Sequence, residues 1–308
     1  MKQRTITAIV LMLILVPLIV IDHEVTKCLY AVVAVLLCGI GGYEIMNVMH
    51  KDSPELKGYK IFIPILTGIL GGLTLLATYK TSESILGLKE SYIYHFYPLL
   101  FLVLSVSLIM GLMIFTKNSE ARAIMGCILA LVYSGLMLGY SLSLRYFAPL
   151  ALNNDLIHIS GFKSLAYVYI IAISTDTFAY IFGIKFGKTK LCPTISPKKS
   201  VVGAVVGLIF GTVIGTIVAY LFGIVTPSGV SEIVLTTLLL LFISAFISVV
   251  VQLGDLVESK IKRSFDTKDF GNIFPGHGGV LDRFDSLIYS GVWFYIIVQI
   301  IQLIILGA

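Results

Sequence analysis

Residues 233–254 read IVLTTLLLLFISAFISVVVQLG, and Asp255 follows them directly. An α-helix needs about 20 apolar residues to cross a hydrocarbon core about 30 Å thick, and this stretch supplies them. Backbone exposed to lipid must satisfy its hydrogen bonds within its own segment, so the stretch predicts a membrane-spanning helix. An acidic residue then stands where that helix leaves the membrane.

Eight further stretches have a similar length and apolar character: 5–21, 28–47, 61–79, 93–115, 123–143, 164–184, 201–222 and 287–307. Hydrophobic residues make up 57% of the 308 positions and charged residues only 13%, whereas a soluble domain has about 25% charged residues. The mean hydropathy is +0.99. The first stretch follows Lys2 and Arg4 without a small-residue cleavage pattern, so we expect a helix there and not a removed leader.

The alternating pattern of a membrane β-barrel is absent. The sequence therefore predicts an all-α fold: a polytopic integral membrane helical bundle of about nine transmembrane helices, in a single membrane domain covering 1–308.

The distribution of Lys and Arg between these spans predicts their orientation. The N-terminus and the segments 48–60, 116–122, 185–200 and 255–286 together carry 17 of the 22 basic residues, and the alternate segments carry 5. Cytoplasmic loops are enriched in Lys and Arg. We therefore expect a cytoplasmic N-terminus and a C-terminus on the opposite side.

Two of these basic segments, 185–200 and 255–286, hold ten of the 22 basic residues. Such a concentrated positive charge suits a polyphosphate substrate or anionic lipid headgroups. A nucleic-acid partner is not expected, because no soluble domain is available to present a groove-binding element. The cysteines, Cys28, Cys38, Cys127 and Cys192, show no C-x-x-C spacing and support neither a disulfide framework nor a zinc site.

The chain divides functionally near residue 160. Residues 1–160 are variable N-terminal spans with little chemistry, where we interpret Glu44 as an interface residue and give His95 no role. In the second part, 161–308, Asp176 lies inside a span at a cost of a few kcal/mol, so it indicates function more than a structural hydrogen bond. The glycines of 201–222 recur every fourth residue and predict a close-packing helix face: Gly203, Gly207, Gly211 and Gly215.

The densest group of polar residues begins where the 233–254 span ends. Asp255, Ser259 and Lys262 recur at i, i+4 and i+7 and so share one helix face. A glycine-rich loop follows, in which Gly276, Gly278 and Gly279 let backbone N–H groups turn toward phosphate oxygens. Asp282 and Asp285 then open the last span. Carboxylates and lysines beside such a loop favour a magnesium–nucleotide site over a solvated loop with capping acids.

A second basic segment lies on the same side of the membrane. It contains lysines and hydroxyl groups before the start of the 201–222 span: Lys188, Lys190, Ser196, Lys198, Lys199 and Ser200. Together they favour an anion cradle at a helix start. Lysines are also common at the cytoplasmic end of a span, so the same residues fit ordinary membrane topology.

These residues resemble a known family. The pattern Ser259-x-x-Lys262-Arg263-x-x-x-x-Lys268-Asp269-x-Gly271-x-x-x-Pro275-Gly276-His277-Gly278-Gly279-x-x-Asp282-Arg283-x-Asp285 closely resembles the signature of the phosphatidate cytidylyltransferase (CDP-diacylglycerol synthase) family. The motif-level resemblance covers roughly the last 135 residues. One departure is Val202, which replaces the glutamate usual after the family's Ser-Pro-Lys-Lys motif. A slower enzyme, or one with an altered substrate, is therefore an open alternative.

The resemblance implies that CTP and phosphatidic acid give CDP-diacylglycerol and pyrophosphate in phospholipid synthesis. It implies metal binding by Asp255 and Asp282, with Asp176, Asp269 and Asp285 as second candidates. The residues implied to hold phosphates or nucleotide are Lys188, Ser196, Lys198, Lys199, Ser259, Lys262, Arg263, Lys268, Gly278, Gly279 and Arg283. His277 is expected to shape the loop or contact phosphate.

The implied cofactor is Mg²⁺, with a monovalent cation such as K⁺ as an additional candidate. The expected location is the inner membrane of the cell, with the site facing the cytoplasm. The oligomeric state is open, a homodimer included.

Three other functions fit parts of the sequence. Other membrane phosphotransferases would carry an Asp-Gly-x-x-Ala-Arg or Asp-Asp-x-x-Asn motif, and neither occurs. An ion-coupled transporter could use Asp176 and Asp255, but the halves show no internal repeat. A non-catalytic relative is suggested only by Val202.

Overall fold

The computed structural model describes residues 2–50, 58–83, 93–116, 121–147, 150–152, 157–274, 276 and 278–305. Within these residues nearly all regular structure is helical, and eight helices are long and apolar enough to cross a membrane. The predicted all-α membrane fold is confirmed. The first predicted span is also helical, as α1 (Lys2–Val20), but it is not one of the eight.

The chain forms two compact units whose segments alternate along the sequence. The first unit contains Met1–Ser143 and Ser264–Phe284, and the second contains Leu144–Arg263 and Asp285–Ala308. These boundaries describe packing, and the functional division near residue 160 stays a prediction. The return of Ser264–Phe284 to the first unit is not evident from the sequence. That all of 1–308 forms one membrane domain stays a prediction.

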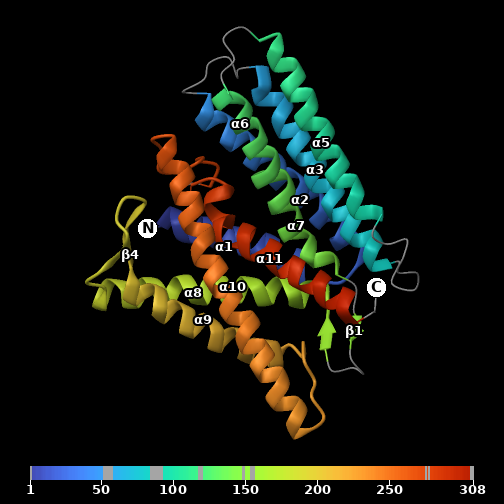
Figure 1. Ribbon diagram of the computed structural model, residues 1–308, viewed down its shortest axis with the longest axis vertical. Coiled ribbons are helices and arrows are strands. Elements are labelled where there is room, and N and C mark those ends of the chain that lie inside the picture. The colour runs from blue at the N-terminus through green and yellow to red at the C-terminus, as the bar shows by residue number, and fades with distance from the viewer. Residues whose placement is uncertain are drawn as a thin grey trace. The chain divides into compact units, whose positions relative to one another are not determined.

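The first unit is built on close helix packing. Its further helices are α2 (Glu24–Met49), α3 (Tyr59–Glu83), α5 (Ile93–Ile114), α6 (Ala121–Leu129), the π-helical η2 (Ala130–Met137) and α7 (Leu138–Ser143). Helix α3 packs against α2, α5, η2 and α7, and Figure 1 shows α2, α3 and α5 running alongside one another. Small residues permit the contact, because a Cβ on Gly42 would collide with Thr67 and one on Gly71 with Cys38.

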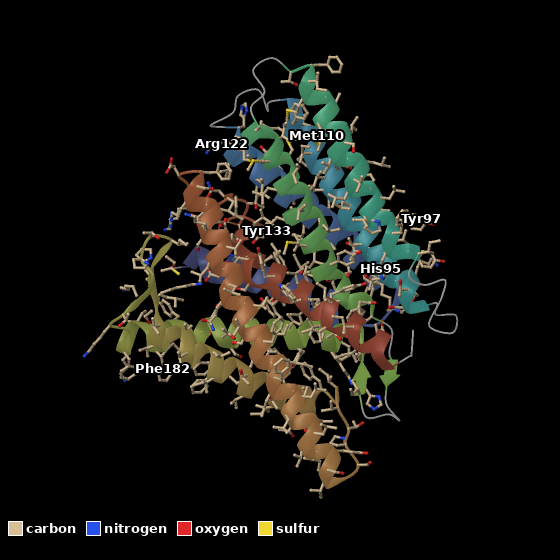
Figure 2. The ribbon with its side chains drawn as sticks, in the orientation of Figure 1. His95, Tyr97, Met110, Arg122, Tyr133 and Phe182 are labelled. Carbon is tan, nitrogen blue, oxygen red and sulfur yellow. The ribbon has the colours of Figure 1, made fainter. Side chains whose placement is uncertain are left out.

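The loop between α10 and α11, residues 265–280, is here called the signature loop, and it belongs to the first unit. Arg122 of α6, labelled in Figure 2, donates from Nη2 to the carbonyl oxygen of Ser264 at 3.3 Å. Its guanidinium also lies 5.3 Å from the centre of the Phe265 ring. These contacts attach the start of the loop to the end of a helix of the same unit.

The second unit begins with short elements and continues with long helices. They are η3 (Leu144–Tyr146), β1 (Leu150–Leu152), β2 (Ile157–Ile159), α8 (Gly161–Phe186), β3 (Lys190–Cys192), β4 (Ser196–Ser200), α9 (Val201–Leu221), α10 (Val230–Ser264) and α11 (Leu281–Ile305), the last from Asp285 onward. Strands β1 and β2 pair antiparallel, and so do β3 and β4, with Lys190 opposite Ser200.

The predicted glycine face on α9 is confirmed. Gly203, Gly207, Gly211 and Gly215 are all buried, and α8 and α9 lie side by side (Figure 1). A Cβ on Gly207 would collide with Ala179 and with the carbonyl oxygen of Thr175 on α8. Hydroxyl pairs connect α8 with α10: Tyr167 with Ser244 at 2.7 Å and Thr175 with Ser248 at 2.8 Å.

Candidate active site

A cavity of about 700 Å³ lies in the second unit, among α8, the β3–β4 hairpin, α9 and α10. A cavity of this size accommodates a nucleotide-sized ligand. The polar and charged side chains in its wall are Asp176, Tyr180, Lys190, Lys198, Lys199, Ser200, Gln252 and Asp255. Acidic groups on two helices therefore face the same space as three lysines of the hairpin.

The β3–β4 hairpin is fixed where it enters α9. Ser200 is buried and caps this helix, because its Oγ accepts a hydrogen bond from the Gly203 N–H at 3.2 Å. Lys198 and Lys199 come directly before the cap in β4. Val202, where the resembled family usually carries glutamate, lies in the first turn of α9 with its side chain 37% exposed.

Asp255 of α10 is held by the hairpin. Lys199 Nζ lies 2.6 Å from Asp255 Oδ2, and the two side chains are 26% and 27% exposed. Ser259, one turn further along α10, donates to Asp255 Oδ1 at 3.3 Å. The prediction that Asp255 and Ser259 share one helix face is confirmed. The ion pair between Lys199 and Asp255 also brings together the two basic segments of the sequence, 185–200 and 255–286.

Asp176 faces the polar interior of the second unit, as the cost of an acid in a span predicted. Ser286 of α11 donates to Asp176 Oδ2 at 2.9 Å, and the Ser286 N–H donates to Asp285 Oδ1 at 2.6 Å. The charges of Asp255 and Asp285 both act on Asp176. Asp176 thus lines the cavity, as a functional residue would. It also accepts a hydrogen bond from a neighbouring helix, as a purely structural aspartate would.

A second ion pair lies one turn beyond Asp255. Lys262 Nζ is 2.9 Å from Oε1 of Glu258, whose side chain is fully buried. Lys262 therefore neutralises the charge of a buried carboxylate on its own helix. This role is separate from its proposed contact with phosphate. Arg263, the next residue, is exposed.

The signature loop is organised by Asp282 within the first unit. Asp282 Oδ2 accepts hydrogen bonds from the backbone N–H of Phe270 at 2.9 Å and of Gly279 at 2.8 Å. Gly276 and Gly278 adopt positive φ, of 75° and 82°, which a residue with a side chain rarely adopts. The Gly279 amide, expected from the sequence to face phosphate, donates to Asp282 in this structure.

The predicted site residues are divided between the two units. Those in the second unit are Asp176, Lys188, Ser196, Lys198, Lys199, Asp255, Ser259, Lys262, Arg263 and Asp285. Those in the first unit are Lys268, Asp269, Gly278, Gly279, Asp282 and Arg283. His277 lies outside the described residues. Of the whole set, Asp176, Lys198, Lys199 and Asp255 line the cavity, and that Asp255 and Asp282 share one ion stays a prediction.

Sequence reasoning missed two buried acids: Glu258 has no role there, and the interpretation of Glu44 as an interface residue is wrong, because its carboxylate binds backbone amides in the interior. Glu258 is fully buried, and Glu44 of α2 is 2% exposed. The cost of an ionisable group inside an apolar helix, which singled out Asp176, applies equally to Glu44 and would have found it.

The magnesium ion that the family resemblance implies can be tested against these side chains. Across the part of the chain that the structure covers, no group of three or more His, Cys, Asp or Glu side chains could hold a metal ion. Mg²⁺ needs only one or two carboxylates when substrate phosphates and water complete its shell. Asp176 and Asp255 face the cavity, and Asp255 already accepts the ammonium group of Lys199. The residues fit an ion that binds together with a nucleotide.

Comparison with known proteins adds an independent observation. The sequence matches the Cytidylyltransferase family over residues 2–301. It is 32% identical over 302 residues to the phosphatidate cytidylyltransferase of Bacillus subtilis (strain 168), covering 97% of this chain and 98% of that protein. It is 30% identical over 290 residues to the phosphatidate cytidylyltransferase of Staphylococcus haemolyticus (strain JCSC1435), covering 94% of this chain and 95% of that protein.

Proposed function

The chain belongs to the cytidylyltransferase family, and from this membership we propose that it transfers the cytidylyl group of CTP to phosphatidic acid, giving CDP-diacylglycerol and pyrophosphate. Its near full-length similarity to two phosphatidate cytidylyltransferases supports this substrate pair. It is a nucleotidyltransferase with several apolar helices that can cross a membrane.

The observation that carries the proposed site is the cavity in which Lys199 meets Asp255. In the reaction, a phosphate oxygen of phosphatidic acid attacks the α-phosphorus of CTP. The bond from that phosphorus to the oxygen bridging to the β-phosphate breaks, and pyrophosphate leaves with the bonding electrons. The attacking oxygen is already ionised at pH 7, so no side chain has to remove a proton.

The protein must hold two repelling anions together and neutralise the departing pyrophosphate, which is work for positioning and charge. Lys190, Lys198 and Lys199 supply positive charge from the hairpin. Asp176 and Asp255 would hold Mg²⁺, which supplies further charge neutralisation to the phosphates when bound. Lys262, Arg263 and Arg283 are proposed as additional phosphate contacts.

The proposed site faces the cytoplasm, where CTP is made. The support is the asymmetry of basic residues between the spans, which assigns both basic segments to that side.

Radiolabelled CTP tests the proposal directly. Purified protein with phosphatidic acid and magnesium is expected to convert the label into a product extractable by organic solvent. The conversion should stop when phosphatidic acid is left out or a chelator removes magnesium. No labelled lipid under complete conditions would overturn the proposed function, and unchanged conversion with the chelator would overturn the role of magnesium.

A further inference from the structure

Glu44 lies near the end of α2, in the part of the chain that looked chemically quiet, and is 2% exposed. Both of its carboxylate oxygens are used by the start of α11. Oε1 accepts the Val280 N–H at 2.8 Å, and Oε2 accepts the Leu281 N–H at 3.1 Å. The first N–H groups of a helix lack partners within the helix, and a negative charge there is favourable. Glu44 thus caps α11 from a helix more than 200 positions earlier in the sequence.

The same carboxylate explains two glycines of the signature loop. A Cβ on Gly271 or on Gly279 would collide with Glu44, in each case with Oε1 and Cδ. Neither glycine adopts positive φ, in contrast to Gly276 and Gly278 of the same loop. Gly271 and Gly279 are therefore required by the space that Glu44 occupies, and not by backbone conformation.

Asp282 holds the loop from the other side. It accepts the N–H groups of Phe270 and Gly279, so two carboxylates together bind four backbone amides of one short segment. Glu44 and Asp282 are close enough for their like charges to interact, which is unfavourable. The amide hydrogen bonds offset that repulsion. Asp282 binds the Gly279 amide, which directly precedes the Val280 and Leu281 amides that Glu44 binds.

We infer that Glu44 is a positioning residue for the transferase reaction: it holds the signature loop at Gly271, Gly279 and Val280, and thereby orients Asp282. Glu44 acts through the loop and not on the substrate. The inference rests on the proposed function for its effect on turnover, whereas its structural part does not depend on activity.

A double-mutant comparison tests the contact. Gly279→Ala in the otherwise unchanged protein is expected to lower kcat at least about 10-fold, or about 1.4 kcal/mol of activation free energy, because the new Cβ collides with Glu44. In a Glu44→Ala background, which has itself lost turnover, the same substitution should cost less than about 2-fold, since neighbouring sites are not additive. In a Glu44→Gln background the side chain keeps its volume, so the cost of Gly279→Ala should persist.

Gly278→Ala is the matched control. The three atoms nearest to its Cβ would all belong to Asp282, and its positive φ makes alanine strained in every background. Its cost should therefore be the same whether residue 44 is Glu, Gln or Ala. We also expect Glu44→Ala to lower kcat while the KM for CTP changes less than about 3-fold, because Glu44 does not touch CTP and acts only by orienting Asp282, which the family resemblance implies as a metal ligand.

Backbone hydrogen exchange supplies a readout that needs no activity. Peptides covering 278–284 should exchange faster in Glu44→Ala than in the unchanged protein, with Glu44→Gln in between. Equal costs of Gly279→Ala in all three backgrounds, or unchanged exchange, would overturn the inference even if the enzyme is active. An unchanged protein that makes no CDP-diacylglycerol, but whose loop exchanges faster in Glu44→Ala, would contradict the proposed function alone.

Discussion

Lys199 and Asp255 form an ion pair in which both side chains are about a quarter exposed. Pairs that are open to solvent contribute only about 0–1 kcal/mol to stability. Removing the charge of Asp255 should therefore leave the fold nearly unchanged. Its effect on the reaction should be large, because the same carboxylate faces the cavity where phosphates and magnesium are proposed to bind.

Asp255→Asn is expected to reduce turnover by at least about 100-fold, because a metal ion supplies several kcal/mol of charge stabilisation in the transition state. Asparagine keeps the shape of the side chain, so protein yield in the membrane should not fall. The measurement is magnesium-dependent formation of CDP-diacylglycerol, with magnesium varied in each assay.

Glu232→Gln serves as the control for Asp255→Asn. Glu232 lies on the same helix, 23 positions earlier, which corresponds to about 35 Å along an α-helix. It should keep its activity within a few-fold. Near-normal turnover of Asp255→Asn would contradict the proposed metal role of this carboxylate.

Glu258 and Lys262 form an ion pair that, unlike the pair of Lys199 and Asp255, is expected to contribute to stability. The Glu258 side chain is fully buried, so loss of the ammonium group 2.9 Å away should cost about 2 kcal/mol, the range for hydrogen bonds to charged groups. We expect Lys262→Met to lower the midpoint of thermal unfolding of the purified protein clearly more than Lys260→Met, which removes an exposed lysine from the same turn. Equal midpoints for the two variants would show that this pair does not stabilise α10.

At the scale of elements, the α9 glycine face was predictable because its period is local. The four glycines recur at the spacing of one helical face, and no knowledge of the partner helix is needed to see it. The extension of α10 beyond its apolar stretch was indicated by a second local pattern, the i, i+4, i+7 spacing of Asp255, Ser259 and Lys262. The apolar stretch ends at residue 254, but the helix continues to Ser264. Glu, Lys and Arg favour helix as strongly as most apolar residues, so hydropathy marks the end of the membrane span and not the end of the helix.

The β3–β4 hairpin could not be predicted from sequence periodicity. Its residues are mostly polar and its strands are three and five residues long, too short to show an alternating pattern. The lysines of Ser196–Ser200 were expected at a helix start, and Ser200 does cap α9. What the sequence lacked was the antiparallel pairing that turns Lys199 toward Asp255.

Gly211→Leu tests the packing role of α9. A side chain at Gly211 would collide with Thr175 Oγ1 of α8 and meet Ser248 Oγ of α10, which are themselves hydrogen-bonded to each other. Overpacking of this kind typically costs about 1–3 kcal/mol. We expect a lower midpoint of thermal unfolding and a lower yield of active protein.

Val213→Leu is the matched control for Gly211→Leu, because Val213 lies on the same helix and is 45% exposed. It should leave the unfolding midpoint unchanged. If both leucine variants unfold at the same temperature, the glycine face does not set the approach of these helices.

At the scale of the whole molecule, the sequence predicted the class of fold but not its division into units. Hydropathy reports whether each segment can span a membrane, and it carries no information about which distant segments contact each other. The return of Ser264–Phe284 to the first unit depends on contacts such as those of Glu44 with Val280 and Leu281. For the same reason Glu44, although it stands out by burial, could not be connected with the signature loop from its position in the sequence.

The family signature predicted the reaction class from the last part of the chain alone, whereas the family match extends over residues 2–301. The first spans therefore belong to the family as much as the signature does. Glu44 gives a physical reason for this, because a residue of α2 caps the helix that carries Asp282.

The last prediction concerns the orientation of the chain in the membrane. Because 17 of the 22 basic residues lie in one alternating set of segments, we expect a reporter inserted near Thr189 to lie in the cytoplasm. A reporter fused after Ala308 should lie on the opposite side, since α9, α10 and α11 separate these two points. Reporters that are active on one side of the membrane only, a phosphatase and a fluorescent protein, provide the measurement.

The parity of the spans makes a third reporter informative. Helix α1 is not among the eight helices that are long and apolar enough to span within the described residues. If α1 crosses the membrane, a reporter at the N-terminus lies in the cytoplasm with Thr189. If α1 does not cross, that reporter moves to the other side, while those near Thr189 and after Ala308 keep theirs. A periplasmic or extracellular signal near Thr189 would instead place the cavity lysines away from CTP and contradict the proposed orientation as a whole.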